Sequence, residues 1–189
     1  MPTPEPDLRK PNRGPAAGPG NRAALIAAAR EVYAVEGLSA PFSAVARRAG
    51  VGQGSLYRHF PDRRALAVAV FEENLIDLEE FTAPADRTID DLLDRVVAQA
   101  MVATALIDLI TADLHDPRVA PLGIRFRDIV SRLLARERAL GHVGAHIEVE
   151  DVMMATGMLA TELARADPQQ RPETARRARA LLRAAFAPR

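Results

Sequence analysis

The chain has 189 residues, of which 48% are hydrophobic and 26% charged, a composition that favours a folded protein over a disordered one. It contains no cysteine, which excludes thiolate catalysis, cysteine-bound zinc, iron–sulfur clusters and disulfides. No run of about 20 apolar residues predicts a membrane span, and the first residues lack the apolar core of a signal peptide. We therefore expect a soluble, cytoplasmic protein with no membrane partner.

The charge is unevenly distributed along the chain. The formal net charge is zero, but residues 1–65 hold ten basic and five acidic side chains, a net charge of +5 that the rest of the chain must balance. Opposite signs in the two parts predict that the N-terminal part binds a polyanion and that the C-terminal part has another role.

Residues 1–20 contain six prolines and three glycines, a density that predicts a flexible arm without helix or strand. A first amphipathic helix is predicted from near Asn21 to Gly37. Its apolar residues recur at steps of three and four; they are Leu25, Ala28, Ala29, Val32 and Val35.

Two short helices follow, at residues 41–49 and 53–60, joined by a turn at Gly50 that favours a positive φ. Ala46 supplies the small side chain that a helix-turn-helix needs where its two backbones nearly touch. The apolar residues expected to hold the second helix against the first are Val45, Ala49, Val51, Leu56 and Phe60. A longer helix is predicted from Asp62 to Phe81.

Beyond Pro84 every segment again has helical periodicity, and no alternating strand pattern competes with it. The predicted helices cover residues 89–104, 105–114, 121–140, 150–166 and 172–186, with breaks at 115–119, 141–147 and 167–171. The fold is predicted to be all-α, with an arm (1–20), a helix-turn-helix domain (21–81) and a C-terminal helical domain (82–189).

Several side chains in the N-terminal part are suited to DNA. The second short helix leaves exposed a set of hydrogen-bonding side chains, namely Gln53, Ser55, Tyr57, Arg58 and His59. Gly52 and Gly54 would let the backbone approach a duplex closely. Arg63 lies near the start of a helix, where the helix dipole does not stabilise a positive charge. We therefore expect its partner to be an external anion.

Basic side chains of the arm extend the predicted contact to the sugar–phosphate backbone or a minor groove; they are Arg9, Lys10 and Arg13, with Arg22 beyond them. Other residues have plainer interpretations. Phe60 is interpreted as core and Tyr57 as partly core, whereas a solvated helix face explains Arg47 and Arg48 at least as well as phosphate contact does.

From Asn21 to about Phe81 the sequence resembles the TetR (TetR/AcrR-type) family of transcriptional regulators, most specifically in the run GSLYRHF, residues 54–60, followed by Arg63. The resemblance implies a major-groove helix at 53–59, with Tyr57, His59 and Arg63 on phosphates. Pro41 stands where the family has Ser or Thr, which leaves Ser39 or Ser43 as the alternative contact, and Gly52 replaces a capping Ser. The predicted DNA-binding residues are Arg13, Arg22, Ser43, Gln53, Gly54, Ser55, Tyr57, Arg58, His59 and Arg63.

The resemblance also implies that the C-terminal part binds an effector and forms a homodimer through its last two helices. The residues assigned to the dimer interface are Val152, Ala155, Leu159, Leu163, Ala178, Leu181, Leu182 and Ala185. An effector pocket among the middle helices has the candidates Met101, Leu106, Ile110, Phe126, Ile129, Leu133, Met154 and Met158, although the same helical spacing also describes plain core.

No catalytic or metal site is predicted. His142 and His146 are four residues apart, but Gly141 and Gly144 make their segment a loop, so they do not share a helix face. No Ser/His/Asp arrangement or phosphate-binding loop is present. We expect neither an enzyme nor a cofactor.

The function predicted on this basis is that of a homodimeric transcriptional repressor released from its operator by a small hydrophobic ligand. Two equivalent heads require a pseudo-palindromic operator with half-sites about 34 Å apart. The helix at 62–81 would act as the lever between the heads and the pocket. The alternative is a helical ligand-binding or scaffold protein without specific DNA binding.

Overall fold

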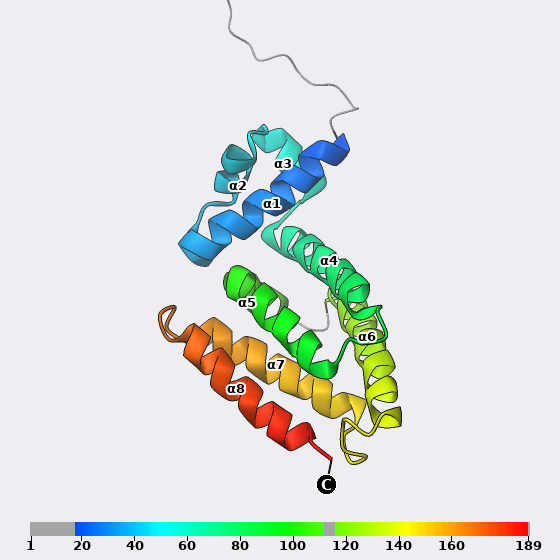
Figure 1. The fold of residues 1–189 in the computed structure, drawn as a ribbon. Coiled ribbons are helices and arrows are strands. Elements are labelled where there is room, and N and C mark those ends of the chain that lie inside the picture. Colours follow the sequence, from blue (N-terminus) through cyan, green and yellow to red (C-terminus); the bar gives the residue numbers. More distant parts are fainter. Residues whose placement is uncertain (1–17, 112–115, 189) are drawn as a thin grey trace, which may run out of the picture.

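The computed structural model describes residues 18–111 and 116–188, without the side chains of residues 102–105 and 108–111. Every regular element in these ranges is helical, so the all-α prediction is confirmed. The three helices α1, α2 and α3 form a small bundle at one end of the molecule, which we call the head (Figure 1). Their bounds, with a short 3-10 turn, are α1 Gly18–Glu36, η2 Gly37–Ser39, α2 Phe42–Ala49 and α3 Gln53–His59.

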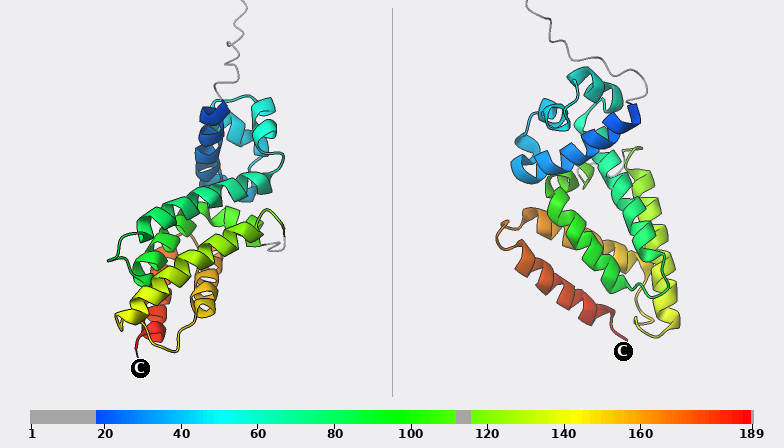
Figure 2. Two further views of the ribbon diagram at one scale, coloured as in Figure 1. Left: turned by 90° about the vertical axis from the view of Figure 1, so that its right-hand side faces the viewer. Right: turned by 45° about the horizontal axis from the view of Figure 1, so that its top comes forward.

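The long helix α4, Arg63–Thr82, leads from the head into the C-terminal region, where it packs against α5 and α6 (Figures 1 and 2). The remaining helices are α5 Ile89–Thr111, α6 Ala120–Ala139, α7 Val149–Arg165 and α8 Arg171–Phe186. Helix α5 is central, because it contacts α4, α6, α7 and α8 and also reaches α1.

Local sequence explains where several helices begin. The Asp62 carboxylate accepts a hydrogen bond from the Ala65 N–H at 2.7 Å and so caps α4. Thr88 and Asp91 exchange side-chain and backbone hydrogen bonds, of 2.9 and 3.1 Å, before α5. Glu148 and Asp151 do the same before α7. Each arrangement satisfies N–H groups that have no partner inside the first helical turn.

A buried carboxylate fixes the start of α5 from another helix. Glu137 of α6 is only 5% exposed, and its carboxylate accepts a hydrogen bond from the Ile89 N–H at 3.0 Å. Its other oxygen lies 3.1 Å from His142 Nδ1. Glu137 therefore ties α6 to the beginning of α5, and His142 belongs to this contact.

Two predictions about helix extent are wrong. Residues 89–111 form the single helix α5, with no break after Thr104, because no glycine or proline interrupts this stretch. Helix α1 begins at Gly18, so the last three residues of the predicted arm are helical. Pro19 is tolerated there because the first turn of a helix needs no N–H at that position. Residues 1–17, including Arg9, Lys10 and Arg13, lie outside the described part.

Candidate nucleic-acid interface

The connection between α2 and α3 has the predicted helix-turn-helix geometry. Gly50 has φ +68°, and its N–H closes α2 by donating to the carbonyls of Ala46 and Arg47. The Val51 N–H donates to the Ala46 carbonyl at 3.0 Å. Ala46 is 1% exposed, which agrees with the need for a small residue where the two helices meet.

Helix α3 is held to the head by apolar side chains on one side only. Leu56 is fully buried and Phe60 is 2% exposed, and both belong to the core that α1 and α2 also supply. Seven residues are too few for an isolated helix to be stable, so this packing determines its orientation. The opposite side of α3 is left to solvent.

The solvent side of α3, which we call the reading face, contains no acidic residue. Gln53, Gly54, Tyr57 and Arg58 are exposed there, and Ser55 and His59 are half-buried; together these six residues form the reading face. Tyr57 is 53% exposed and meets the Phe42 ring edge-on, with ring centroids 5.5 Å apart. Its ring is thus supported by α2 while much of it stays exposed, as the mixed interpretation of Tyr57 predicts.

The first turns of α2 and α3 have no side-chain cap. Pro41 precedes α2 and Gly52 precedes α3, and neither supplies a capping hydrogen bond. The Ser39 hydroxyl donates to the Glu36 carbonyl at 2.7 Å, within its own turn. Ser43 is half-buried in α2. A Cβ atom built on Gly54 would meet no protein atom within 4 Å, so this part of α3 faces open space.

Arg63 is turned inward, which corrects the expectation that it binds a phosphate. Its guanidinium donates to the Leu38 carbonyl and, at 2.6 Å, to the Ala40 carbonyl. Both acceptors lie in the connection between α1 and α2. Arg63 therefore satisfies backbone carbonyls that no helix bond satisfies, and it fixes the start of α4 to the head.

The other basic residues of the head differ in their partners. Arg22 forms an ion pair with Glu72 at 3.5 Å, and its guanidinium lies 5.6 Å from the centre of the Phe60 ring. Arg48 pairs with Glu31, which agrees with its interpretation as part of a solvated helix face. Arg47 is exposed.

The face of α7 assigned to the dimer interface lies in the core of the chain itself, so this prediction is wrong. Its residues are almost completely inaccessible, with Val152 and Leu163 at 0%, Leu159 at 2% and Ala155 at 6% exposure. They pack where α7 meets α5. In α8, Ala178 and Leu182 are partly buried against the same core, whereas Leu181 and Ala185 are exposed.

Two of the predicted pocket residues lie on the outside. Met154 and Met158 are 60% and 65% exposed on α7, so they cannot line an interior pocket. Because apolar residues lie almost all round α7, its sequence does not show which face is buried.

The other pocket candidates lie in or beside the core. Leu106, Ile129 and Leu133 are at most 2% exposed, and Met101 and Phe126 are partly buried. The side chain of Ile110 lies outside the described part.

Two surface hollows, of about 410 and 370 Å³, lie elsewhere. The first is lined by residues at the end of α6 and in the loop that follows it, including Arg138, and by Pro188 near the C-terminus. The second lies between α1, α4 and α5, where Arg30 donates to Asn74 Oδ1 at 2.8 Å and Arg95 pairs with Asp77. Its polar side chains satisfy one another, so it does not resemble an apolar effector pocket.

A cationic head with a buried helix-turn-helix scaffold, followed by a bundle of longer helices, defines the class of helix-turn-helix DNA-binding regulators. Residues 25–70 match the sequence model of the bacterial regulatory proteins of the tetR family. These residues span most of α1, the whole helix-turn-helix and the beginning of α4.

Solved structures of similar fold cover almost the whole chain. The TetR transcriptional regulator SCO0520 from Streptomyces coelicolor is 26% identical, with a TM-score of 0.65 over 88% of this chain and 98% of that one. A TetR transcription regulatory protein from Mycobacterium vanbaalenii is 24% identical, with a TM-score of 0.65 over 91% and 98%. A TetR-family regulator from Pectobacterium atrosepticum is 21% identical, with a TM-score of 0.62 over 92% and 95%.

Residues 25–70 are therefore similar to the DNA-binding domain of the tetR regulatory proteins, and the chain as a whole has the fold of TetR-family transcriptional regulators. No curated protein sequence matches it. Within the described ranges, no helix is both long enough and apolar enough to cross a lipid bilayer.

Proposed function

We propose that this regulator is a homodimeric repressor that reads a pseudo-palindromic operator and releases it when a small hydrophobic molecule binds the C-terminal domain. The main support for DNA binding is the reading face of α3. It presents Gln53, Tyr57 and Arg58 to solvent on a helix whose other side is locked by Leu56 and Phe60. Amide and guanidinium groups are the side chains that pair most specifically with base edges in the major groove.

The proposal divides the chain into three parts. The arm, now residues 1–17, supplies basic groups including Arg13; the head and α4 read DNA; and residues 82–189 bind the effector and form the dimer. Residues proposed to contact DNA are Arg13, Arg22, Ser43 and the reading face. Arg63 supports this surface from behind, since its guanidinium bonds to backbone carbonyls.

The exposed apolar residues of α7 and α8 support dimerisation. Met154 and Met158 are separated by one helical turn on α7, and Leu181 of α8 is 73% exposed. Gly157 of α7 and Ala185 of α8 are small and exposed, which allows close helix approach. An apolar face of this kind favours burial against a copy of itself across a two-fold axis.

Repression and release require two states of the dimer. In one state the spacing of the heads fits the operator, and in the other it does not. An effector would have to bind the second state more tightly, because equal affinity for both would leave the equilibrium between them unchanged. The pocket is proposed to form around Met101, Leu106, Ile110, Phe126, Ile129 and Leu133 by side-chain rearrangement.

Selecting bound duplexes from genomic fragments tests the DNA-binding part, followed by titration of the best duplex with salt. The affinity should fall steeply, with a slope of log K against log salt of about −0.9 for each neutralised phosphate. Arg58→Ala should lower the affinity by roughly tenfold to a hundredfold if its guanidinium contacts a base.

The matched control is Arg127→Ala, which removes an exposed arginine of α6 that pairs with Glu150. It should leave the affinity unchanged. Duplex binding that is insensitive both to salt and to Arg58→Ala would instead support a helical ligand-binding or scaffold protein.

A further inference from the structure

Three successive residues at the start of α4 bind different parts of the molecule. Arg63 donates to carbonyls in the α1–α2 connection, which attaches the first turn of α4 to the head. Asp62 and Arg64, on either side of it, instead contact residues 116–118 of the connection between α5 and α6. The first turn of α4 is therefore a junction between the head and the C-terminal domain.

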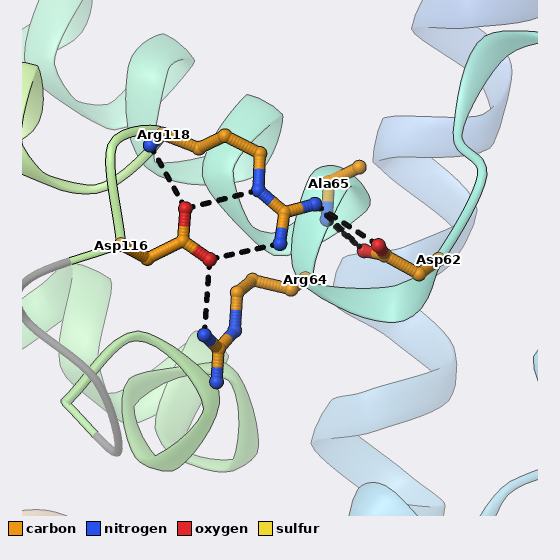
Figure 3. A network of polar contacts seen from close by, with 5 residues as sticks. All are labelled: Asp62, Arg64, Ala65, Asp116 and Arg118. Atoms are coloured by element: carbon orange, nitrogen blue, oxygen red, sulfur yellow. Dashed lines mark hydrogen bonds and ion pairs between the residues drawn. The ribbon is translucent and has the colours of Figure 1, made fainter.

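Arg118 is the centre of this junction (Figure 3). Its Nε and Nη2 donate to the two carboxylate oxygens of Asp116 at 3.0 and 2.8 Å. Its Nη1 donates to both oxygens of Asp62, at 3.2 and 3.0 Å. One planar guanidinium thus joins two carboxylates that are 54 positions apart in the sequence, a geometry that a lysine could not reproduce.

Asp116 is held from a second direction. Arg64 Nη1 donates to its Oδ2 at 3.0 Å, and the Arg118 N–H donates to its Oδ1 at 2.9 Å. The side chain is only 9% exposed. Hydrogen bonds from the Arg118 guanidinium, from the Arg118 N–H and from Arg64 hold the pKa of Asp116 well below its usual range. The carboxylate therefore stays ionised and bonded at neutral pH.

Asp62 has two separate functions in this cluster. It caps α4 through the Ala65 N–H, and it binds Arg118. Burial opposes its ionisation, but the hydrogen bond from Ala65 and the Arg118 guanidinium outweigh this and keep the pKa of Asp62 below its ordinary value. Asp62 stands three residues after His59, the last residue of α3. A displacement of Asp62 is thus passed to α3 through a very short connection.

We propose that Arg118 is a positioning residue for DNA reading, which holds the start of α4, and with it α3, at one angle to the C-terminal domain. This inference rests on the proposed function, since the angle matters because each subunit of a dimer must present its α3 at a fixed spacing. A single exposed ion pair contributes little, but a guanidinium shared by two carboxylates fixes both distance and direction. Residues 116–118 are therefore a point at which the C-terminal domain controls the head, beside the direct packing of α1 on α5.

Two variants separate the roles in the cluster. Arg118→Ala removes both carboxylate contacts. Asp62→Asn keeps a good helix cap for the Ala65 N–H but removes the charge that faces Arg118. Arg127→Ala is the control, because it removes an ion pair between α6 and α7, that of Arg127 with Glu150, which involves neither α4 nor residues 116–118.

The readout is the distance between the head and the C-terminal domain, measured between two spin labels in the full chain. The chain has no cysteine, so Val35→Cys and Ala135→Cys introduce the only thiols. Val35 is 86% exposed on α1, and Ala135 is exposed on α6. Mixing the labelled chain with an excess of unlabelled chain restricts the signal to distances within one subunit. Affinity for the selected duplex is measured on the same variants without labels.

We expect Arg118→Ala and Asp62→Asn to broaden the distance distribution and to lower the duplex affinity roughly fivefold or more, while Arg127→Ala does neither. Distributions identical to that of the unsubstituted chain would overturn the proposal. If Arg118→Ala did not fold, Asp62→Asn would decide, because its cap is preserved. A lack of duplex binding by the unsubstituted chain would refute the proposed function, and the distance measurement would still decide the role of Arg118.

Discussion

Two arginines five positions apart show how environment assigns different roles to one residue type. Arg58 lies on the solvent side of α3, where the described residues offer it no carboxylate or carbonyl partner. Arg63 is half-buried and donates to the carbonyls of Leu38 and Ala40. The first is available to an external anion, and the second is part of the scaffold.

Arg63→Ala should therefore lower the free energy of unfolding by about 2 kcal/mol, because two carbonyls lose charged donors. Urea denaturation followed by circular dichroism measures this change. Arg58→Ala, on the exposed side of α3, should change stability by less than about 0.5 kcal/mol. An unchanged midpoint for Arg63→Ala would restore its interpretation as a phosphate ligand.

At the scale of helices, glycine and proline punctuation predicted most boundaries. The breaks near Gly50, Pro61 and Pro84 all occur, and the predicted breaks after residues 114, 140 and 166 also separate helices. Which side of a helix is buried was harder to predict. Helix α7 has apolar residues nearly all round, so periodicity alone could not tell that Val152 faces the core and Met158 faces solvent.

Helix α3 offers a test that separates stability from binding. Gly54→Ala should stabilise the protein by about 0.5 to 1 kcal/mol, because alanine favours helix and the added methyl meets no protein atom within 4 Å. The same methyl should weaken binding of the selected duplex if the α3 backbone approaches DNA closely. Thermal melts and duplex titrations measure the two effects.

Gly123→Ala is the matched control for this substitution. Gly123 is also exposed, lies in α6 and has equally open space around its Cα. It should give the gain in stability without loss of binding. If Gly54→Ala bound the duplex as tightly as the unsubstituted chain, α3 would not present its first turn to DNA.

At the scale of the whole molecule, the proposed dimer depends on the exposed apolar residues of α7 and α8, which would bring two heads together. Met158→Arg places a charge among these residues and should yield a monomer that binds a two-half-site duplex more weakly. Sedimentation measures the mass, and circular dichroism checks that the helices remain.

Ile124→Arg is the matched control. It changes an equally exposed apolar residue of α6, 62% exposed against 65% for Met158, and should leave the dimer intact. A Met158→Arg chain that sediments as the unsubstituted chain would exclude the exposed apolar residues of α7 and α8 as the interface.

Local chemistry alone determined the helical class, the turn at Gly50 and the apolar lock of Leu56 and Phe60, because turns and short-range periodicity depend on neighbours in the sequence. The GSLYRHF run was sufficient to identify the DNA-binding domain. The direction of Arg63, the buried side of α7 and the contact of Arg118 with Asp62 were decided by tertiary structure. Each depends on groups brought together from distant parts of the chain, and a side chain's own sequence neighbours contain no information about such partners.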